Sequence, residues 1–499
     1  MIRDIFDNIK QGQDVRQNLI KLKAELKEES QRASLLYYMG GDYSILEELL
    51  THEDAKVRKN TALIIGELKI PAFLDKLYQG YETETQLFVK SAYLTAMKGF
   101  DYTNLLPDLK KRWNNLNHME AEESNKKHIQ EEIRCLSDLI IAKEGIVKHK
   151  FIGYDVPSKM VLLTNRNYKN ITLDQLKGIQ AKEFNAGIIL KIDQLREILD
   201  IRTYSECLFI LDDLKTCKMN VEEAAGAIAG SSLIEFLNKR HEGTEPYYFR
   251  IELKSKLPLD KKSAFAKKLG TEITRLSNQK LINSASNYEF ELRLIENKEG
   301  NLNVLVKLYT LEDKRFLYRK NVIAASIQPV NAAFLAELAK EYLKEDAQVL
   351  DPFCGVGTML IERNYLVPAN TMYGLDIYAE AVCKGKENAK EAHTIIHYIN
   401  RDFFDFKHEY LFDEIFTNMP RAIGNKEEDE IFNIYRRFFK KAPEHLKYGG
   451  VIIIYTHNRD YVKKLADKNI YRMEAEYEIS KKEGAYLMVI RYMDKTSKE

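Results

Sequence analysis

The stretch that decides the fold is Val349-Leu350-Asp351-Pro352-Phe353-Cys354-Gly355-Val356-Gly357-Thr358-Met359-Leu360-Ile361-Glu362. The apolar residues up to Leu350 predict a buried strand, and Thr358 to Glu362 predict the start of a helix. The glycine-rich turn between them exposes backbone N–H groups and lets a polar ligand approach closely. Its spacing is neither that of a dinucleotide turn, G-x-G-x-x-G, nor that of a phosphate loop, which needs Gly-Lys-Ser/Thr. Asp351 at the strand end suits a cationic or hydroxyl-bearing ligand rather than a phosphate.

A second acidic strand end follows. The run Met372 to Asp376 predicts the next strand, and Asp376 lies 25 residues after Asp351. An acid at the end of the second strand of a βαβ unit commonly holds the hydroxyls of a ribose. The alternative is that Asp376 is an acidic N-cap for a helix that begins near Ala379.

Three more strands are predicted further along the chain, over residues 394–399, 414–417 and 451–455. The first of these precedes Asp402-Phe403-Phe404, where a carboxylate can accept from an adenine amine and an aromatic ring can stack on the base. The second precedes Asn418. Five strands with polar ends, alternating with helices, predict a doubly wound parallel sheet with its ligand at the carboxyl edge.

These motifs closely resemble those of class I S-adenosylmethionine (SAM) methyltransferases. Within that class the chain is similar to the THUMP-domain RNA guanine-N2 methyltransferases, whose first motif is DPFCGSGT. The resemblance covers residues 322–499 by motif. It implies a Rossmann-like α/β domain with a seven-stranded sheet over these residues, and SAM as the cofactor.

The resemblance also implies a set of cofactor-binding residues: Ser326, Gln328, Asp351, Pro352, Phe353, Cys354, Gly355, Gly357, Thr358, Asp376, Ile377, Asp402, Phe403 and Asn418. In this family the first acid and the glycines of the turn hold the methionine end of SAM. Asp376 would take the ribose hydroxyls, and Asp402 with Phe403 the adenine. The segment Ser326 to Pro329, before a helix predicted over 331–343, resembles the family's pre-core motif.

The catalytic residues that the resemblance implies are Asn418, Pro420 and Arg421, in Asn418-Met419-Pro420-Arg421. Family members carry Asn/Asp-Pro-Pro-Tyr/Phe there. The Asn oxygen and a nearby backbone carbonyl can accept both N–H bonds of an exocyclic amine and aim its lone pair at the methyl carbon. Met419 and Arg421 depart from the pattern. A guanidinium plane at 421 can replace the aromatic ring that stacks on a flipped base, and it can also meet a phosphate.

The N-terminal part shows an internal repeat. The pattern that begins at Val15-Arg-Gln-Asn18 recurs at Val57-Arg-Lys-Asn60, an offset of 42 residues. This offset lies within the HEAT/armadillo range of about 40–47 residues. With a weaker third copy at Phe88 to Ala92, it predicts an all-α HEAT-like solenoid over residues 1–145, which can recruit a protein partner. An ordinary helical bundle is the alternative.

The middle part, residues 146–321, is predicted to be α+β, and in the order of its elements it resembles a ferredoxin-like segment followed by a THUMP-like RNA-binding module. Its pattern predicts strands over 249–254, 288–294 and 302–308 and a helix over 263–276. Between Pro246 and Lys320 there are sixteen Lys and Arg against nine Asp and Glu, in a chain with a net charge of +1. The paired cations 261–262, 267–268, 314–315 and 319–320 favour contacts with RNA phosphates.

The composition agrees with a multidomain globular protein of the cytoplasm. The 499 residues are 45% hydrophobic and 30% charged, and the five cysteines form no C-x-x-C pair. We therefore expect no metal site and no disulfide framework. No apolar run is long enough to span a membrane, and we expect no signal peptide.

The sequence thus predicts a SAM-dependent methyltransferase acting on structured RNA, tRNA or rRNA, at the N2 amine of a guanine. Two alternatives stay open. The first is another amine methyltransferase, acting on adenine N6 or a protein glutamine, because both use an Asn-Pro tetrad. The second is a non-catalytic RNA-binding or assembly protein that keeps the fold.

Overall fold

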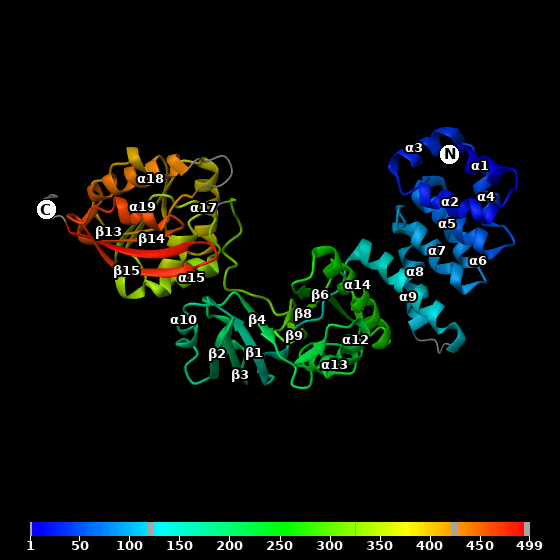
Figure 1. Cartoon of the computed structure of the whole chain (residues 1–499), viewed down its shortest axis with the longest axis horizontal. Coiled ribbons are helices and arrows are strands. Elements are labelled where there is room, and N and C mark those ends of the chain that lie inside the picture. The colour runs from blue at the N-terminus through cyan, green and yellow to red at the C-terminus, as the bar shows by residue number, and fades with distance from the viewer. Residues whose placement is uncertain (1, 118–122, 325, 422–427, 494–499) are drawn as a thin grey trace. The chain divides into compact units, whose positions relative to one another are not determined.

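The structure is a computed structural model that describes residues 2–117, 123–324, 326–421 and 428–493. It divides into two compact units, Met1–Lys148 and His149–Glu499. Figure 1 shows their elements coloured along the chain. The domain boundary predicted between residues 321 and 322 lies within the second unit and stays a prediction.

The described elements of the first unit are helices, because apolar residues recur at helical spacing with little strand-type alternation. The α-helices are α1 (Ile2–Lys10), α2 (Val15–Glu25), α3 (Glu29–Met39), α4 (Ser44–Leu50), α5 (Ala55–Leu68), α6 (Leu74–Thr83), α7 (Leu87–Met97), α8 (Leu106–Asn117) and α9 (Glu123–Glu144). The two copies of the repeat lie on α2 and α5, which pack against each other. α5 then packs on α7, and α7 on α9.

The contact between α5 and α7 is close. A Cβ on Gly66 of α5 would lie 2.7 Å from the Cα of Ala96. The backbones of the two helices are therefore nearly in contact here. The copies also touch through polar groups, since Lys23 Nζ donates to Asn60 Oδ1 at 2.8 Å. Repeats that bury their faces against one another are typical of a solenoid. The assignment to the HEAT class stays a prediction.

The second unit contains two sheets. The first has the strand order β2-β3-β1-β4-β9-β8-β6-β7, with β5 paired to β9. Its strands are β1 (Ser158–Leu163), β2 (Gln180–Phe184), β3 (Gly187–Ile192), β4 (Glu206–Phe209), β5 (Thr216–Lys218), β6 (Tyr247–Lys254), β7 (Leu281–Asn283), β8 (Phe290–Glu296) and β9 (Asn301–Leu308). The accompanying helices are α10 (Asn170–Leu173), α11 (Arg196–Leu199), α12 (Val221–Ala229), α13 (Leu233–Asn238) and α14 (Leu259–Leu276).

The predicted hairpin of the middle part is present as β8 and β9, which pair antiparallel with Glu296 opposite Leu302. The predicted strand over 249–254 is β6. The predicted helix over 263–276 is α14, which starts four residues earlier at Leu259. In its first turn Leu259 is 79% exposed and the next three residues are charged, so the apolar periodicity used for the prediction begins only in the second turn.

The second sheet has the order β12-β11-β10-β13-β14-β16-β15. Its strands are β10 (Gln348–Asp351), β11 (Thr371–Asp376), β12 (His397–Asn400), β13 (Phe412–Asn418), β14 (Leu446–Thr456), β15 (Tyr471–Ser480) and β16 (Ala485–Tyr492). The neighbouring pairs from β12 to β14 are parallel, and β16 runs antiparallel to both β14 and β15. The five strands predicted from the sequence are therefore present.

Helices cover both faces of this sheet. They are α15 (Pro329–Leu338), α16 (Thr358–Leu366), α17 (Ala379–Glu391), α18 (Glu428–Lys441) and α19 (Arg459–Leu465). Adjacent residues of β10 belong to different cores: Val349 packs with residues of α15 and α16, and Leu350 with residues of α18 and α19. Helix α15 ends at Leu338 and is followed by a 3₁₀ turn, Lys340–Tyr342, so the predicted helix to residue 343 is too long.

Ion pairs join the two sheets of this unit. Arg202, after α11, donates to both carboxylate oxygens of Glu362 on α16 at 2.8 Å. Tyr318 Oη donates to the same carboxylate at 2.6 Å. Glu362 is 1% exposed, so its charge depends on these partners. Among the described helices of the protein, none is long and apolar enough to cross a membrane.

A buried histidine in the second unit makes stability depend on pH. His445 is 2% exposed and packs against the rings of Phe403 and Phe406. Burial lowers the pKa of His445 from 6.5 to about 4. The folded protein holds the neutral form, so its contribution is complete above pH 6.5 and is lost as the pH falls from 6.5 to 4. At about 1.4 kcal/mol per pKa unit, the loss is about 3 kcal/mol.

We therefore expect His445→Leu to reduce the acid sensitivity of the second unit. Denaturant unfolding at pH 7 and pH 4.5 should show a smaller loss of stability in the variant than in the wild type. Among the described residues, the ring nitrogens of His445 make no hydrogen bond of good geometry, although the Phe406 backbone is close enough to raise the pKa of His445 against the effect of burial. An equal loss in both proteins would mean that His445 is not the group that titrates.

Candidate active site

The turn from β10 to α16 requires glycine at one position in particular. Gly355 and Gly357 have φ of 51° and 80°, the left-handed region that favours glycine. A Cβ on Gly357 would lie 1.9 Å from the hydroxyl oxygen of Tyr398. No side chain fits there unless Tyr398 moves, so glycine is required at position 357.

Asp351, at the end of β10, is buried beneath this turn. Its Oδ1 accepts from Thr417 Oγ1 at 2.6 Å and from the Phe353 N–H at 3.1 Å. Its Oδ2 is buried, and no residue that the structure describes bonds to it. Burial raises the pKa of Asp351 from 3.8 to about 7, and the nearby charge of Asp376 acts in the same direction. The site therefore contains an acidic oxygen that a cationic or N–H-bearing ligand would satisfy.

The remaining residues of the turn are packed. Cys354 is 6% exposed and Pro352 is buried. Burial raises the pKa of the Cys354 thiol well above its usual value, so the sulfur stays protonated and is a poor nucleophile. Thr358 is 3% exposed, and within the described chain its Oγ1 has no partner.

Asp376 ties the ends of β10 and β11 together. Its Oδ2 accepts from the Gly355 N–H at 3.0 Å, and its Oδ1 from the Tyr378 N–H at 2.8 Å. The N-cap of α17 is Tyr378, so Asp376 is not the helix cap and that alternative is wrong. Ile377, next to it, is 58% exposed, which leaves its surface available to a ligand.

The third strand end differs from the prediction at one residue. Asp402 accepts from the Phe404 N–H at 2.9 Å and lies 3.8 Å from Arg437. Phe403 is 1% exposed, with its ring in the core beside Phe438. Its ring therefore offers no face to an adenine, and the prediction for Phe403 is wrong in that respect. The half-buried ring is that of Phe404, with the Arg437 guanidinium 3.8 Å from its centroid.

The tetrad begins where β13 ends. Asn418 is the last residue of the strand, opposite Tyr455 of β14, and is half-buried. Met419 is 2% exposed, and its N–H donates to the Tyr455 carbonyl at 3.0 Å. Pro420 is half-buried and Arg421 is exposed. Since Thr417 bonds to Asp351, the tetrad and the glycine turn share one edge of the sheet.

A residue that the sequence analysis missed meets the tetrad. His457 follows β14, and its Nε2 lies 3.1 Å from Arg421 Nη1. The signal was available in principle, because the apolar run of β14 ends in the polar residues Thr456-His457-Asn458.

The pre-core segment passes beside the glycine turn. A Cβ on Gly355 would lie 3.6 Å from Ile323 Cδ1. Ser326 Oγ accepts from the Ile323 N–H at 3.0 Å, which fixes the segment before α15. Gln328 is the exposed N-cap residue of α15, and its Oε1 accepts from Arg319 at 3.1 Å. In the ranges that the structure describes, no group of three His, Cys, Asp or Glu side chains is placed to hold a metal ion.

Comparison with known proteins identifies this domain. Residues 317–483 match the UPF0020 family, described as RMKL-like, methyltransferase domain. No protein with a curated description matches the sequence. By this match, residues 317–483 are a methyltransferase domain.

Solved structures share the fold at low identity. TrmN from Thermus thermophilus is 18% identical with a TM-score of 0.50, covering 67% of this chain and 99% of its own. SMU.472, solved in complex with SAH, is 13% identical with a TM-score of 0.53, covering 68% and 99%. A predicted N6-adenine-specific DNA methylase from Listeria monocytogenes is 16% identical with a TM-score of 0.50, covering 67% and 96%. At these identities the likeness concerns the class I methyltransferase fold.

Proposed function

We propose that this protein methylates the exocyclic N2 amine of a guanine in a structured RNA, either tRNA or rRNA. One observation carries the proposal. The tetrad that begins at Asn418 starts directly after Thr417, whose hydroxyl bonds to Asp351 under the glycine turn at 2.6 Å. An amine acceptor and a methyl donor bound at this edge would therefore be neighbours.

The residues at the edge fit the cofactor. The free Oδ2 of Asp351, and the turn around Gly355 and Gly357, suit the charged methionine end of SAM. Each oxygen of Asp376 accepts one backbone N–H, which leaves lone pairs for the ribose hydroxyls. Asp402, at the third strand end, would accept from the adenine amine.

Asn418 would orient the target amine. SAM supplies a methyl group on a sulfonium centre, which is a reactive electrophile. The amide oxygen of Asn418 and a nearby backbone carbonyl would accept the two N–H bonds of the amine, so that its lone pair faces the methyl carbon. Pro420 fixes the backbone after the buried Met419. Arg421 would meet the base, which has to leave its stack to reach the site.

RNA would be gripped by the first sheet of the second unit, for which we propose a THUMP-like role. Two clefts there are lined by lysines. One, of about 580 Å³ between α12 and α14, is lined by Lys267 and Lys268 together with Glu222 and Glu272. The other, of about 280 Å³, is lined by Lys254, Lys256 and Lys262 together with Glu296, and Lys254 also pairs with Glu252. Such cations give affinity and register on a phosphate backbone.

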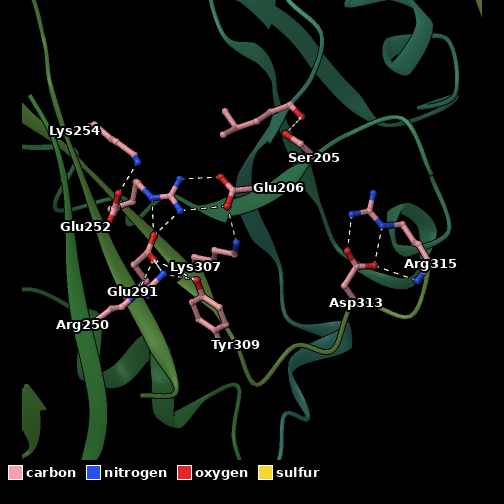
Figure 2. A network of polar contacts seen from close by, with 12 residues as sticks. Ser205, Glu206, Arg250, Glu252, Lys254, Glu291, Lys307, Tyr309, Asp313 and Arg315 are labelled. Atoms are coloured by element: carbon pink, nitrogen blue, oxygen red, sulfur yellow. Dashed lines mark hydrogen bonds and ion pairs between the residues drawn. The ribbon is translucent and has the colours of Figure 1, made fainter. Parts of the chain in front are cut away.

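Other cations of this region are structural. Figure 2 shows Glu206 of β4 accepting from Lys307, while Arg250 and Tyr309 point toward Glu291. These groups neutralise one another on the sheet and contribute little net charge to a phosphate. Because Glu206 lies outside residues 246–320, the surplus of Lys and Arg counted over that range overstates the charge available to RNA.

Two of the paired cations predicted to contact RNA phosphates instead form contacts within the protein. Arg315 is 8% exposed, pairs with Asp313, and donates to the carbonyls of Ile201 and Tyr204. Arg319 donates to Gln328 and to the Ile327 carbonyl. They fix the segment between the two sheets, so we expect the lysine-lined clefts to provide most of the RNA contacts.

The first unit has a separate role in this proposal. We propose that its stack of helices is HEAT-like and that its surface recruits a protein partner. Such stacks offer long surfaces built from successive repeats.

SAM affinity should rise with pH across neutrality. With a pKa of about 7, Asp351 is mostly neutral at pH 6 and mostly ionised at pH 8. A carboxylate binds the cationic end of SAM better than a carboxyl does, so affinity should be about tenfold higher at pH 8. Isothermal titration calorimetry at the two values measures this. Buffers of different ionisation enthalpy should show proton release on binding at pH 6.5, and Asp351→Asn should abolish that release. Equal affinities would contradict the role of Asp351.

The function is tested by transfer of labelled methyl from SAM to unmodified tRNA and rRNA, followed by mass spectrometry of the nucleosides. N2-methylguanosine is the expected product. N6-methyladenosine would keep the enzyme class and overturn the base, since the tetrad suits either exocyclic amine. Methylated protein glutamine would overturn the RNA substrate, and SAM binding without any product would favour the non-catalytic alternative.

A further inference from the structure

The two ring nitrogens of His457 have distinct hydrogen-bond roles because of their partners. Its Nε2 lies 3.1 Å from Arg421 Nη1, and its Nδ1 lies 3.0 Å from the Glu483 carbonyl oxygen. A guanidinium only donates hydrogen bonds, so Nε2 must be the acceptor. Nδ1 then carries the proton and donates to the carbonyl. Both ring nitrogens of His457 are therefore engaged.

His457 links the hairpin of β15 and β16 to the tetrad, because it contacts both Glu483 and Arg421. Glu483 lies in the turn between β15 and β16. His457 leaves the end of β14, whose residue Tyr455 is opposite Asn418, and the Tyr455 ring packs edge-on to the imidazole at 5.4 Å between centroids. An exposed arginine loses much rotamer freedom when it is held in one position. Because His457 already holds the Arg421 side chain in the unbound protein, this entropy is not lost again when RNA binds.

We propose, on the basis of the function proposed above, that His457 is a positioning residue. It holds the Arg421 guanidinium flat at the mouth of the site, where the plane takes the place of the tetrad's usual aromatic ring. Arginine planes stack well on bases and keep outward N–H groups for a phosphate. Since both ring nitrogens of His457 are engaged with Arg421 and the Glu483 carbonyl, His457 does not accept the proton of the methylated amine.

The test compares four variants with the wild type: Arg421→Ala, His457→Ala, the double variant and His457→Gln. We measure kcat and KM for unmodified RNA and the Kd for SAM. Stacking on a base corresponds to about ten- to hundredfold in affinity, so both single variants should lose about tenfold or more in kcat/KM. The double variant should lose no more than the worse single variant, because each change removes the same held plane. His457→Gln keeps an acceptor for the guanidinium and should recover most of the activity.

His408→Ala is the matched control. His408 bonds to the Tyr410 backbone and packs on Phe412, at the start of β13 and so at the opposite edge of the sheet. This variant should match the wild type, and SAM affinity should be unchanged in every variant.

Three outcomes would overturn the inference. They are wild-type kcat/KM in His457→Ala, losses that add in the double variant, or a loss of SAM binding in His457→Ala, which would mark a merely structural role. An inactive wild type on every RNA would overturn the proposed function together with the inference, whereas an active wild type with an unaffected His457→Ala overturns the inference alone.

Discussion

Asn418→Ala should abolish methyl transfer to RNA while SAM still binds with its normal affinity. The alanine removes the side-chain oxygen that would accept from the target amine, so the lone pair is no longer aimed at the methyl carbon. Loss of one well-placed polar group of this kind typically lowers kcat by about 10²–10³. Single-turnover transfer of labelled methyl, with the SAM Kd from calorimetry, measures both quantities.

Asn418→Asp is the matched control for this prediction. It keeps an oxygen acceptor at the end of β13, and the resemblance implies that family members carry either residue there. We expect it to keep part of the activity. Turnover by Asn418→Ala at the wild-type rate would remove Asn418 from the chemistry, and loss of SAM binding would assign it to the cofactor instead.

Glu414→Ala should destabilise the second unit by about 3–5 kcal/mol, since it leaves a buried charge without its partner. The side chains of Glu414 and Arg363 are both 0% exposed. Arg363 donates to the two carboxylate oxygens at 3.0 and 2.8 Å and to the Lys344 carbonyl at 2.6 Å. The Lys344 N–H donates to Glu414 in turn at 2.6 Å. Denaturant unfolding followed by circular dichroism measures the loss.

An exposed pair gives the comparison for this prediction. Glu380 and Lys384 form an i,i+4 ion pair on α17, with side chains 74% and 32% exposed. Exposed helical pairs of this kind contribute about 0.3–0.5 kcal/mol, so Glu380→Ala should change stability little. Similar losses of stability in Glu414→Ala and Glu380→Ala would show that the buried pair contributes no more than an exposed ion pair.

The strands of the C-terminal sheet could be located because they are short apolar runs with polar ends. The edge hairpin of β15 and β16 was not located, although a seven-stranded sheet was expected from the resemblance. β15 is half-exposed over most of its length, with a burial pattern that does not alternate cleanly. A strand of this kind lacks the period-2 signal on which such predictions depend.

The site residues also fall into two groups, those that the local sequence predicts and those that only tertiary packing decides. Backbone geometry at Gly357 and the strand-end acids at Asp351 and Asp376 follow from local sequence. The orientation of Phe403 against Phe404 does not, because adjacent aromatic residues have the same pattern and only packing decides which ring is buried. The same holds for Arg315, which pairs with the nearby Asp313 but also donates to carbonyls more than 100 residues away.

The sequence by itself determined the five parallel strands of the C-terminal domain, the glycine turn and the acids at the strand ends, because each depends on residues within a few positions of one another. Only the tertiary structure decided which charges remain available and which side chains meet the tetrad. His457 and Arg421 are 36 residues apart, and they meet because β13 and β14 pair in parallel register. Contacts across strands depend on that pairing, and no local pattern encodes it.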